Sequence, residues 1–257
     1  MSVVMVEEQS GVALVTLNRP DANNALNRTL SEAITTTFTE LAGSTTVRAI
    51  VLTGAGRNFC AGVDLKALSE EPELLSTGMG LGPASPIVAA LEHCPKPIIG
   101  AINGAAVTGG FELALACDYL FASTEARFAD THARVGILPG WGLSQKLTRI
   151  IGINRAREMS LAGNFIDAHR AEACGLVNRV CNPENLMDET LASAAQVAGG
   201  DANAVVALKA LMNDGAKQNL GDALLLEGER GNAFAKTVDY SQMGERLAAL
   251  RQRAAKQ

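Results

Sequence analysis

Apolar and polar residues follow two different periods along this chain. Near the start, Val3–Val6 and Val12–Leu17 are short β-branched runs separated by Gln9-Ser10-Gly11, a pattern that predicts a hairpin. After Asn27, a suitable N-cap, apolar residues recur at helical spacing. These apolar positions are Leu30, Ile34, Phe38 and Leu41. The chain is therefore expected to open with a hairpin followed by an amphipathic helix.

The rest of the chain divides into a strand-bearing part and a helical part. Further strands are expected at Val47–Thr53, from Ile98, at Asp118–Ala122 and at Val177–Val180, and further helices at Ile87–His93, Ser144–Ile150, Arg155–Leu161, Asp167–Cys174, Asn185–Val197, Ala204–Met212, Leu220–Lys236 and Ser241–Arg253. Glu70–Pro86 is expected to be a mobile loop or a broken helix, and Phe128–Gly142 a long structured loop. Because strands cluster before residue 181, the pattern indicates an α/β core, residues 1–195, with a helical C-terminal region, residues 196–257.

The stretch Ile98–Asp118 combines three features that suit a charged intermediate. It reads as a buried strand, then a glycine-punctuated turn, then a helix whose first turn carries Glu112. A helix N-terminus presents unpaired backbone N–H groups and the positive end of the helix dipole. This stretch is therefore expected to hold a developing negative charge.

A second glycine turn, Cys60-Ala61-Gly62, also follows a predicted strand. If its backbone N–H groups met those of Thr108-Gly109-Gly110, the two turns would form an oxyanion hole. The alternative is two unrelated strand-to-helix turns in which glycine only allows tight backbone geometry.

Two side chains are candidates for proton transfer. Glu112 could act as a base or orient a water, or it could simply be a first-turn glutamate stabilised by the helix dipole. His132 lies between Asp130 and Arg134 and titrates near neutrality, but it could equally be a structural histidine with Asp130 as a cap.

Composition excludes several other classes of function. A net charge of −5 argues against a nucleic-acid partner, and the N-terminus shows neither a signal peptide nor a membrane anchor. The five cysteines lack metal-ligand spacing, which suggests reduced thiols in a cytoplasmic protein with no metal site. Cys60 beside its glycine turn is a further candidate nucleophile. Phosphate-binding and serine-hydrolase motifs are absent.

Three segments in order give the chain a family resemblance. They are FCAGVDL within Gly54–Leu65, KPIIGAINGAAVTGGFELALACD at Lys96–Asp118, and GILPGWGLSQKLTR at Gly136–Arg149. Together with Asn18-Arg19-Pro20 and Asn24-Ala25-Leu26, they resemble the crotonase (enoyl-CoA hydratase/isomerase) superfamily over essentially the whole chain.

The resemblance implies a spiral of ββα units that binds acyl-CoA, and a C-terminal helical trimerisation region giving a homotrimer or a dimer of trimers. It implies that the substrate is a coenzyme A thioester, with no separate cofactor, and that its carbonyl oxygen lies between the N–H groups of Ala61 and Gly109. Glu112 matches the first of two glutamates with which family hydratases activate water. The resemblance also places several residues near the substrate or its coenzyme A. They are Ala22, Asn24, Ala25, Asp64, Leu65, Gly110 and Trp141.

The sequence departs from the hydratase pattern at two positions. His132 stands where the second glutamate is expected, and Trp141 replaces a small residue common in that turn. Hydration of a 2-enoyl-CoA by Glu112 and His132 is the leading prediction. The alternatives are a double-bond isomerase or another reaction of the superfamily, and a protein that binds acyl-CoA without turning it over.

Overall fold

The computed structural model describes residues 2–75, 79–82 and 85–254. The chain divides into two compact units, Met1–Val206 and Ala207–Gln257. The division falls inside helix α10 (Ala202–Gly215), later than the boundary that the sequence pattern suggested after residue 195.

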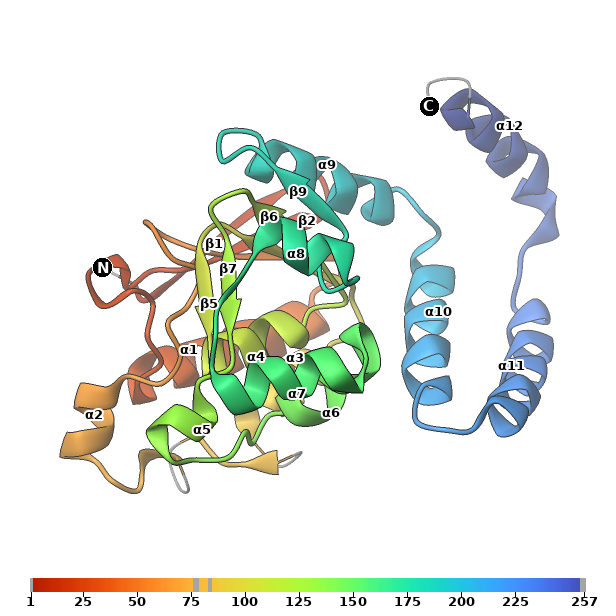
Figure 1. The fold of residues 1–257 in the computed structure, drawn as a ribbon. Helices are drawn as coiled ribbons and strands as arrows, with labels where there is room; N and C mark the ends of the chain where they lie inside the picture. The colour runs from red at the N-terminus through yellow and green to blue at the C-terminus, as the bar shows by residue number, and fades with distance from the viewer. Residues whose placement is uncertain (1, 76–78, 83–84, 255–257) are drawn as a thin grey trace. The chain divides into compact units, whose positions relative to one another are not determined.

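A six-stranded sheet forms the centre of the first unit (Figure 1). Its strands, in spatial order, are β1 (Val4–Gln9), β2 (Val12–Leu17), β3 (Ala49–Gly54), β4 (Ile98–Ile102), β6 (Tyr119–Ser123) and β9 (Arg179–Cys181). β1 and β2 pair antiparallel as the predicted hairpin, and every other pair is parallel. The carboxyl ends of β3 and β4 therefore lie at the same edge, where the two glycine turns begin.

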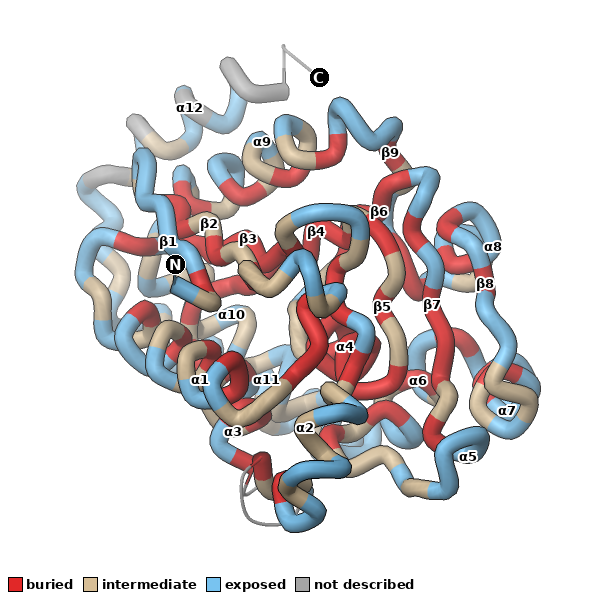
Figure 2. The backbone as a smooth tube through the Cα atoms, turned by 90° about the vertical axis from the view of Figure 1, so that its left-hand side faces the viewer, coloured by how far each residue is buried: buried red, intermediate tan, exposed pale blue. Residues whose placement is uncertain are grey.

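Both faces of the sheet are covered by helices, and the central strands are buried throughout (Figure 2). Ile50 and Leu52 of β3 point into the larger core, while Ala49 and Val51 point into a second core under α9. The helices of the larger core include α1 (Arg28–Gly43), α3 (Pro86–Glu92), α4 (Gly109–Leu115) and α6 (Leu143–Ile151), and α9 (Leu186–Ala198) covers the other face. α1 begins at its predicted cap, because the Asn27 side chain accepts a hydrogen bond from Leu30 N.

Three short strands form a second sheet that the apolar pattern did not predict. They are β5 (Ala105–Val107), β7 (Arg127–Ala129) and β8 (Ile166–Asp167). β5 lies in the predicted glycine turn, and β7 starts just before the predicted loop Phe128–Gly142, which also contains α5 (His132–Val135). Elements of two to four residues are too short to show a period, so these loop predictions were wrong in detail.

Two further helices of the first unit, α7 (Ile153–Ala162) and α8 (Ala168–Ala173), agree with the predicted ones to within a few residues. Helix α2 (Leu65–Glu70) was not predicted. Part of the predicted loop Glu70–Pro86, residues 76–78 and 83–84, lies outside the described residues.

The second unit is entirely helical where it is described. After the end of α10 it contains α11 (Leu220–Ala235), the 3₁₀ turn η4 (Tyr240–Gln242) and α12 (Met243–Ala254). Over the described parts of the chain, no helix combines the length and apolar character needed to cross a bilayer.

Candidate active site

The two glycine turns meet at the carboxyl edge of the sheet. A Cβ atom built on Gly62, whose φ is +92°, would lie 2.7 Å from Val107 O and 3.3 Å from Gly109 N. A Cβ atom on Gly110 would lie 2.1 Å from Cys60 O. Backbone passes so close to backbone here that only glycine fits, and this contact brings the two turns together. Gly110 therefore serves the packing of the two turns, and its predicted place beside coenzyme A stays a prediction.

One of the two predicted oxyanion-hole donors, Ala61, already has a hydrogen-bond acceptor in the protein. Ala61 N donates to Asn23 O at 3.0 Å, so the predicted donor is already used within the protein. Among the described residues, the N–H groups of Val63 and Gly109 have no backbone acceptor. A Cβ atom on Gly109 would lie 3.7 Å from Val63 Cγ2, so these two residues are neighbours.

Thr108 holds the Gly109 N–H in place through an uncommon backbone conformation. Its φ of 53° and ψ of −114° are rare for a β-branched residue. Its N–H donates to Ala129 O at 2.9 Å, and its hydroxyl is hydrogen-bonded to the hydroxyl of Thr131. Strain of this kind persists only where the surroundings fix it, and here it ties the start of α4 to the segment before α5.

Glu112 is buried one turn into α4, and its carboxylate has two different sides. Oε1 accepts hydrogen bonds from Trp141 N at 2.7 Å and Leu143 N at 3.3 Å, at the start of α6. Oε2 lies 3.5 Å from Nε2 of His132. Oε1 is thus fixed by backbone, while Oε2 is available to a reacting group.

His132 is buried between two carboxylates. Its Nδ1 lies 2.6 Å from Oδ1 of Asp130, and its Nε2 faces Glu112. Burial opposes protonation of the ring, but the hydrogen bond with Asp130 and the interaction with Glu112 outweigh it and raise the pKa of His132 to about 9. Burial raises the pKa of the Asp130 carboxyl, but hydrogen bonds with His132 and Ser160 outweigh this effect and hold that pKa below its usual value. At neutral pH the ring is therefore an imidazolium between two carboxylates.

The side chain of Trp141 closes one side of the same site. The indole is buried, and its Nε1 donates to Gly80 O at 3.0 Å. Its Cζ3 atom lies 3.5 Å from the position of a Cβ on Gly109. The ring therefore forms a wall beside the unpaired N–H of Gly109.

The residues predicted to contact coenzyme A lie around the first glycine turn. Asn24 is wholly buried and accepts from Arg19 N while donating to Ala55 O and Asn58 O, so its side chain holds loops together. Asp64 caps α2 and pairs with Arg19 at 3.0 Å, and Leu65 is exposed. Ala22 and Ala25 lie on either side of Asn24 in the loop that precedes α1, where Ala25 N donates to Ala22 O. Arg19, which also donates to Ala25 O, was missed because only the folded loop shows its partners.

Cys60 is unsuited to act as a nucleophile. Its thiol is buried, lies within hydrogen-bonding distance of Asn24 O, and burial raises its pKa to about 12. The structure thus favours a packing role for this cysteine.

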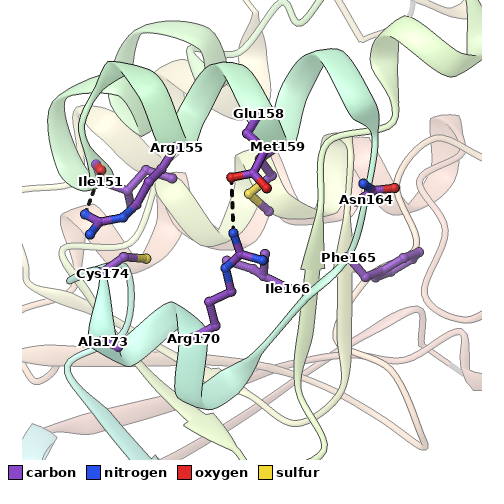
Figure 3. A pocket seen from close by; sticks show the side chains of 10 residues that line it. All are labelled: Ile151, Arg155, Glu158, Met159, Asn164, Phe165, Ile166, Arg170, Ala173 and Cys174. Carbon is purple, nitrogen blue, oxygen red and sulfur yellow. Dashed lines mark hydrogen bonds and ion pairs between the residues drawn. The ribbon is translucent and has the colours of Figure 1, made fainter.

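A separate cavity of about 280 Å³ lies between α7 and α8 (Figure 3). Its lining combines polar and apolar side chains, and Glu158 and Arg170 form an ion pair across it, 3.1 Å apart. None of the residues predicted for the site lines it.

Comparison with known proteins identifies the family of the chain. The sequence profile of the enoyl-CoA hydratase/isomerase family matches residues 7–253. The chain is 44% identical to a probable peroxisomal enoyl-CoA hydratase 1 of Arabidopsis thaliana, over 89% of this chain and 84% of that one, and 35% identical to a short-chain-enoyl-CoA hydratase of Clostridium acetobutylicum, over 92% and 90%.

Solved structures give the same result. The crystal structure of enoyl-CoA hydratase from Bacillus anthracis superimposes with a TM-score of 0.88 at 31% identity, covering 98% of this chain and 96% of that one. That of enoyl-CoA hydratase from Mycobacterium tuberculosis gives 0.74 at 39% identity, covering 90% and 98%. The fold, the paired glycine turns and the sequence relationship together place this chain in the enoyl-CoA hydratase/isomerase family, the crotonase superfamily.

Proposed function

We propose that this enzyme adds water across the 2,3 double bond of a 2-enoyl-CoA, with Glu112 and His132 as its acid–base pair. The observation that carries the proposal is the 3.5 Å separation of Glu112 Oε2 and His132 Nε2 next to the unpaired N–H of Gly109, one turn away on α4. The substrate supplies the coenzyme A thioester, and the reaction needs no further cofactor.

The thioester carbonyl oxygen is held by the N–H groups of Val63 and Gly109. As water attacks C3, the electron pair of the double bond moves to this oxygen and forms an enolate. Two N–H groups fixed before the reaction stabilise that charge, and losing one such donor typically costs about 10²–10³ in kcat. The N–H of Ala61 is already bonded to Asn23 O, which supports Val63 as the second donor.

Glu112 accepts the proton that water loses on attacking C3. Atoms 3.5 Å apart can both reach a single water, so Oε2 of Glu112 and Nε2 of His132 support the same nucleophile. The backbone N–H groups of Trp141 and Leu143 keep Oε1 fixed, which leaves Oε2 to take the proton.

His132 completes the addition by giving its Nε2 proton to C2 of the enolate. Its raised pKa, about 9, keeps the ring protonated at neutral pH. After this step Glu112 carries a proton and His132 is neutral. Transfer of that proton from Oε2 to Nε2 restores both groups for the next turnover.

We further propose that the enzyme is cytoplasmic and works as a trimer or a dimer of trimers. Large apolar side chains on α10 and α11 remain exposed in the single chain, which supports their burial against other copies. They are Leu208, Met212, Leu220, Leu224 and Leu225. Light scattering of the purified protein measures this number of copies.

Hydration of crotonyl-CoA, followed by loss of the conjugated thioester absorbance, tests the function. Wild type is expected to turn over, and Glu112→Gln and His132→Ala are each expected to lose about 10²–10⁴-fold in kcat. The exposed residues Glu184 and His169 provide matched controls, Glu184→Gln and His169→Ala, which are expected to keep full activity. Calorimetric binding of the acyl-CoA by wild type without any turnover would overturn the proposal in favour of a binding protein.

A further inference from the structure

A second carboxylate stands behind His132, on the side away from Glu112. Oδ1 of Asp130 accepts a hydrogen bond from the backbone N of His132 at 3.1 Å and lies 2.6 Å from Nδ1 of the same residue. Asp130 is only 2% exposed and lies on the Nδ1 side of the ring, while Glu112 lies on the Nε2 side. One oxygen therefore fixes both the main chain and the ring of His132.

This arrangement determines which nitrogen of the ring can serve the reaction. With Nδ1–H donating to Asp130, Nε2 is the nitrogen that faces Glu112. A histidine that must deliver a proton from one nitrogen is commonly oriented by an acceptor on the other. The hydroxyl contact between Thr108 and Thr131 holds the same segment against α4.

Polar groups from three elements surround the ring of His132 and its Asp130 partner. Glu112 faces it from α4, and Asp130 faces it from the segment before α5. From α7, the Ser160 hydroxyl is hydrogen-bonded to Asp130 and carries no charge. Arg134, on α5 itself, turns away and donates to Ala162 O at 2.8 Å. Asp130 and Glu112 are therefore the charges that hold a proton on the ring against the effect of burial.

We infer that Asp130 is a positioning residue that keeps His132 doubly protonated with Nε2–H directed at the reacting carbon, an inference that rests on the proposed hydration. Without this carboxylate the ring stays buried, with Glu112 as its remaining anionic neighbour. Protonation then becomes less favourable, and the ring is free to turn or to change tautomer.

The pH dependence of kcat/KM for crotonyl-CoA tests this role. Wild type is expected to lose activity as pH rises through about 9, where His132 deprotonates. Asp130→Asn should move this alkaline limb down by more than one pH unit and lower kcat at neutral pH by about 10–100-fold with little change in KM. Asp130→Glu should restore part of the loss, and the exposed control Asp188→Asn should match wild type. An alkaline limb that does not move in a folded Asp130→Asn variant would overturn the inference.

NMR titration of ¹⁵N-labelled histidine gives a readout that does not depend on activity. In wild type at pH 7, both nitrogens of His132, assigned by comparison with His132→Asn, are expected to be protonated. In Asp130→Asn, the ring is expected to lose its second proton at a pH more than one unit lower than in wild type. A neutral His132 in wild type would overturn the inference even if Asp130→Asn fails to fold. If the NMR titration gave the expected result but the enzyme showed no turnover, the hydratase proposal would be contradicted and the role of Asp130 in holding the proton on His132 would stand.

Discussion

Nε2 of His132 lies 3.5 Å from Oε2 of Glu112, in a site where both side chains are almost wholly buried. The two side chains come from different elements, α4 and α5, and are aligned by contacts behind each of them. Asp130 lies behind the histidine, and the N–H groups of Trp141 and Leu143 lie behind the glutamate. Such an acid–base pair differs from two carboxylates because one member is a cation at neutral pH.

This pairing makes the stability of the protein depend on pH in the neutral to alkaline range. The pKa of His132 is raised from 6.5 to about 9 by folding, so the resulting stabilisation is fully present below pH 6.5 and is lost as pH rises through 9. The loss is on the order of 3–4 kcal/mol, on the scale of about 1.4 kcal/mol per pKa unit. Urea unfolding of wild type should show this fall between pH 6.5 and 9. In His132→Asn the fall should be absent, and equal pH dependence in the two proteins would contradict the assignment.

The backbone donors of the oxyanion hole can be separated by single amide-to-ester replacements. An ester at residue 63 removes an N–H with no backbone acceptor, and it is expected to lower kcat by about 10²–10³. An ester at residue 61 removes the bond to Asn23 O, so it should lower the free energy of unfolding by about 1 kcal/mol and leave kcat nearly unchanged. If the ester at residue 61 abolished turnover and the ester at residue 63 did not, Ala61 rather than Val63 would be the donor.

Trp141 is expected to limit the size of the acyl group. Its ring stands beside Gly109, while its backbone N–H, which a substitution retains, holds Glu112. Trp141→Ala should raise kcat/KM for a longer 2-enoyl-CoA relative to crotonyl-CoA about tenfold and lower the free energy of unfolding by about 3–5 kcal/mol. Trp141→Phe, which keeps a ring, is the control. A ratio that stays the same in Trp141→Ala would show that the indole does not line the acyl site.

Asn24 is expected to contribute to stability rather than to binding. Its amide joins its own loop to the loop after β3, and Asn24→Ala leaves Arg19 N, Ala55 O and Asn58 O without this partner. The free energy of unfolding should fall by about 3 kcal/mol, measured in urea. Asn164→Ala, at an exposed position, should change it by less than about 0.5 kcal/mol. An equal and small effect of both variants would contradict the structural role.

The parts of the fold that the sequence predicted are those where burial repeats with a regular period. Helix α1 is an example, because Leu30, Ile34 and Phe38 mark one face and Asn27 caps its start. β5, β7 and α5 were missed because each is held by distant partners, such as the bridge between Cys60 and Ala106. No local pattern of two to four residues contains that information.

The site was predicted in outline for a similar reason. Glycine turns and an ionisable residue in a first helical turn are visible locally, so Gly109, Glu112 and His132 could all be identified as candidates. Which N–H is free depends on Asn23 O reaching Ala61 N, and only the folded chain shows that contact. The distance of His132 to Glu112 likewise depends on how α5 packs, since the two residues belong to separate elements.

The most direct test that Glu112 and His132 act together as an acid–base pair is a double-mutant cycle on these two residues. kcat/KM for crotonyl-CoA is measured for wild type, Glu112→Gln, His132→Asn and the double variant. If the two groups act as one acid–base unit, the double variant should be no worse than the poorer single variant, because each step needs both groups. Losses that simply multiply would show independent roles and contradict the claim.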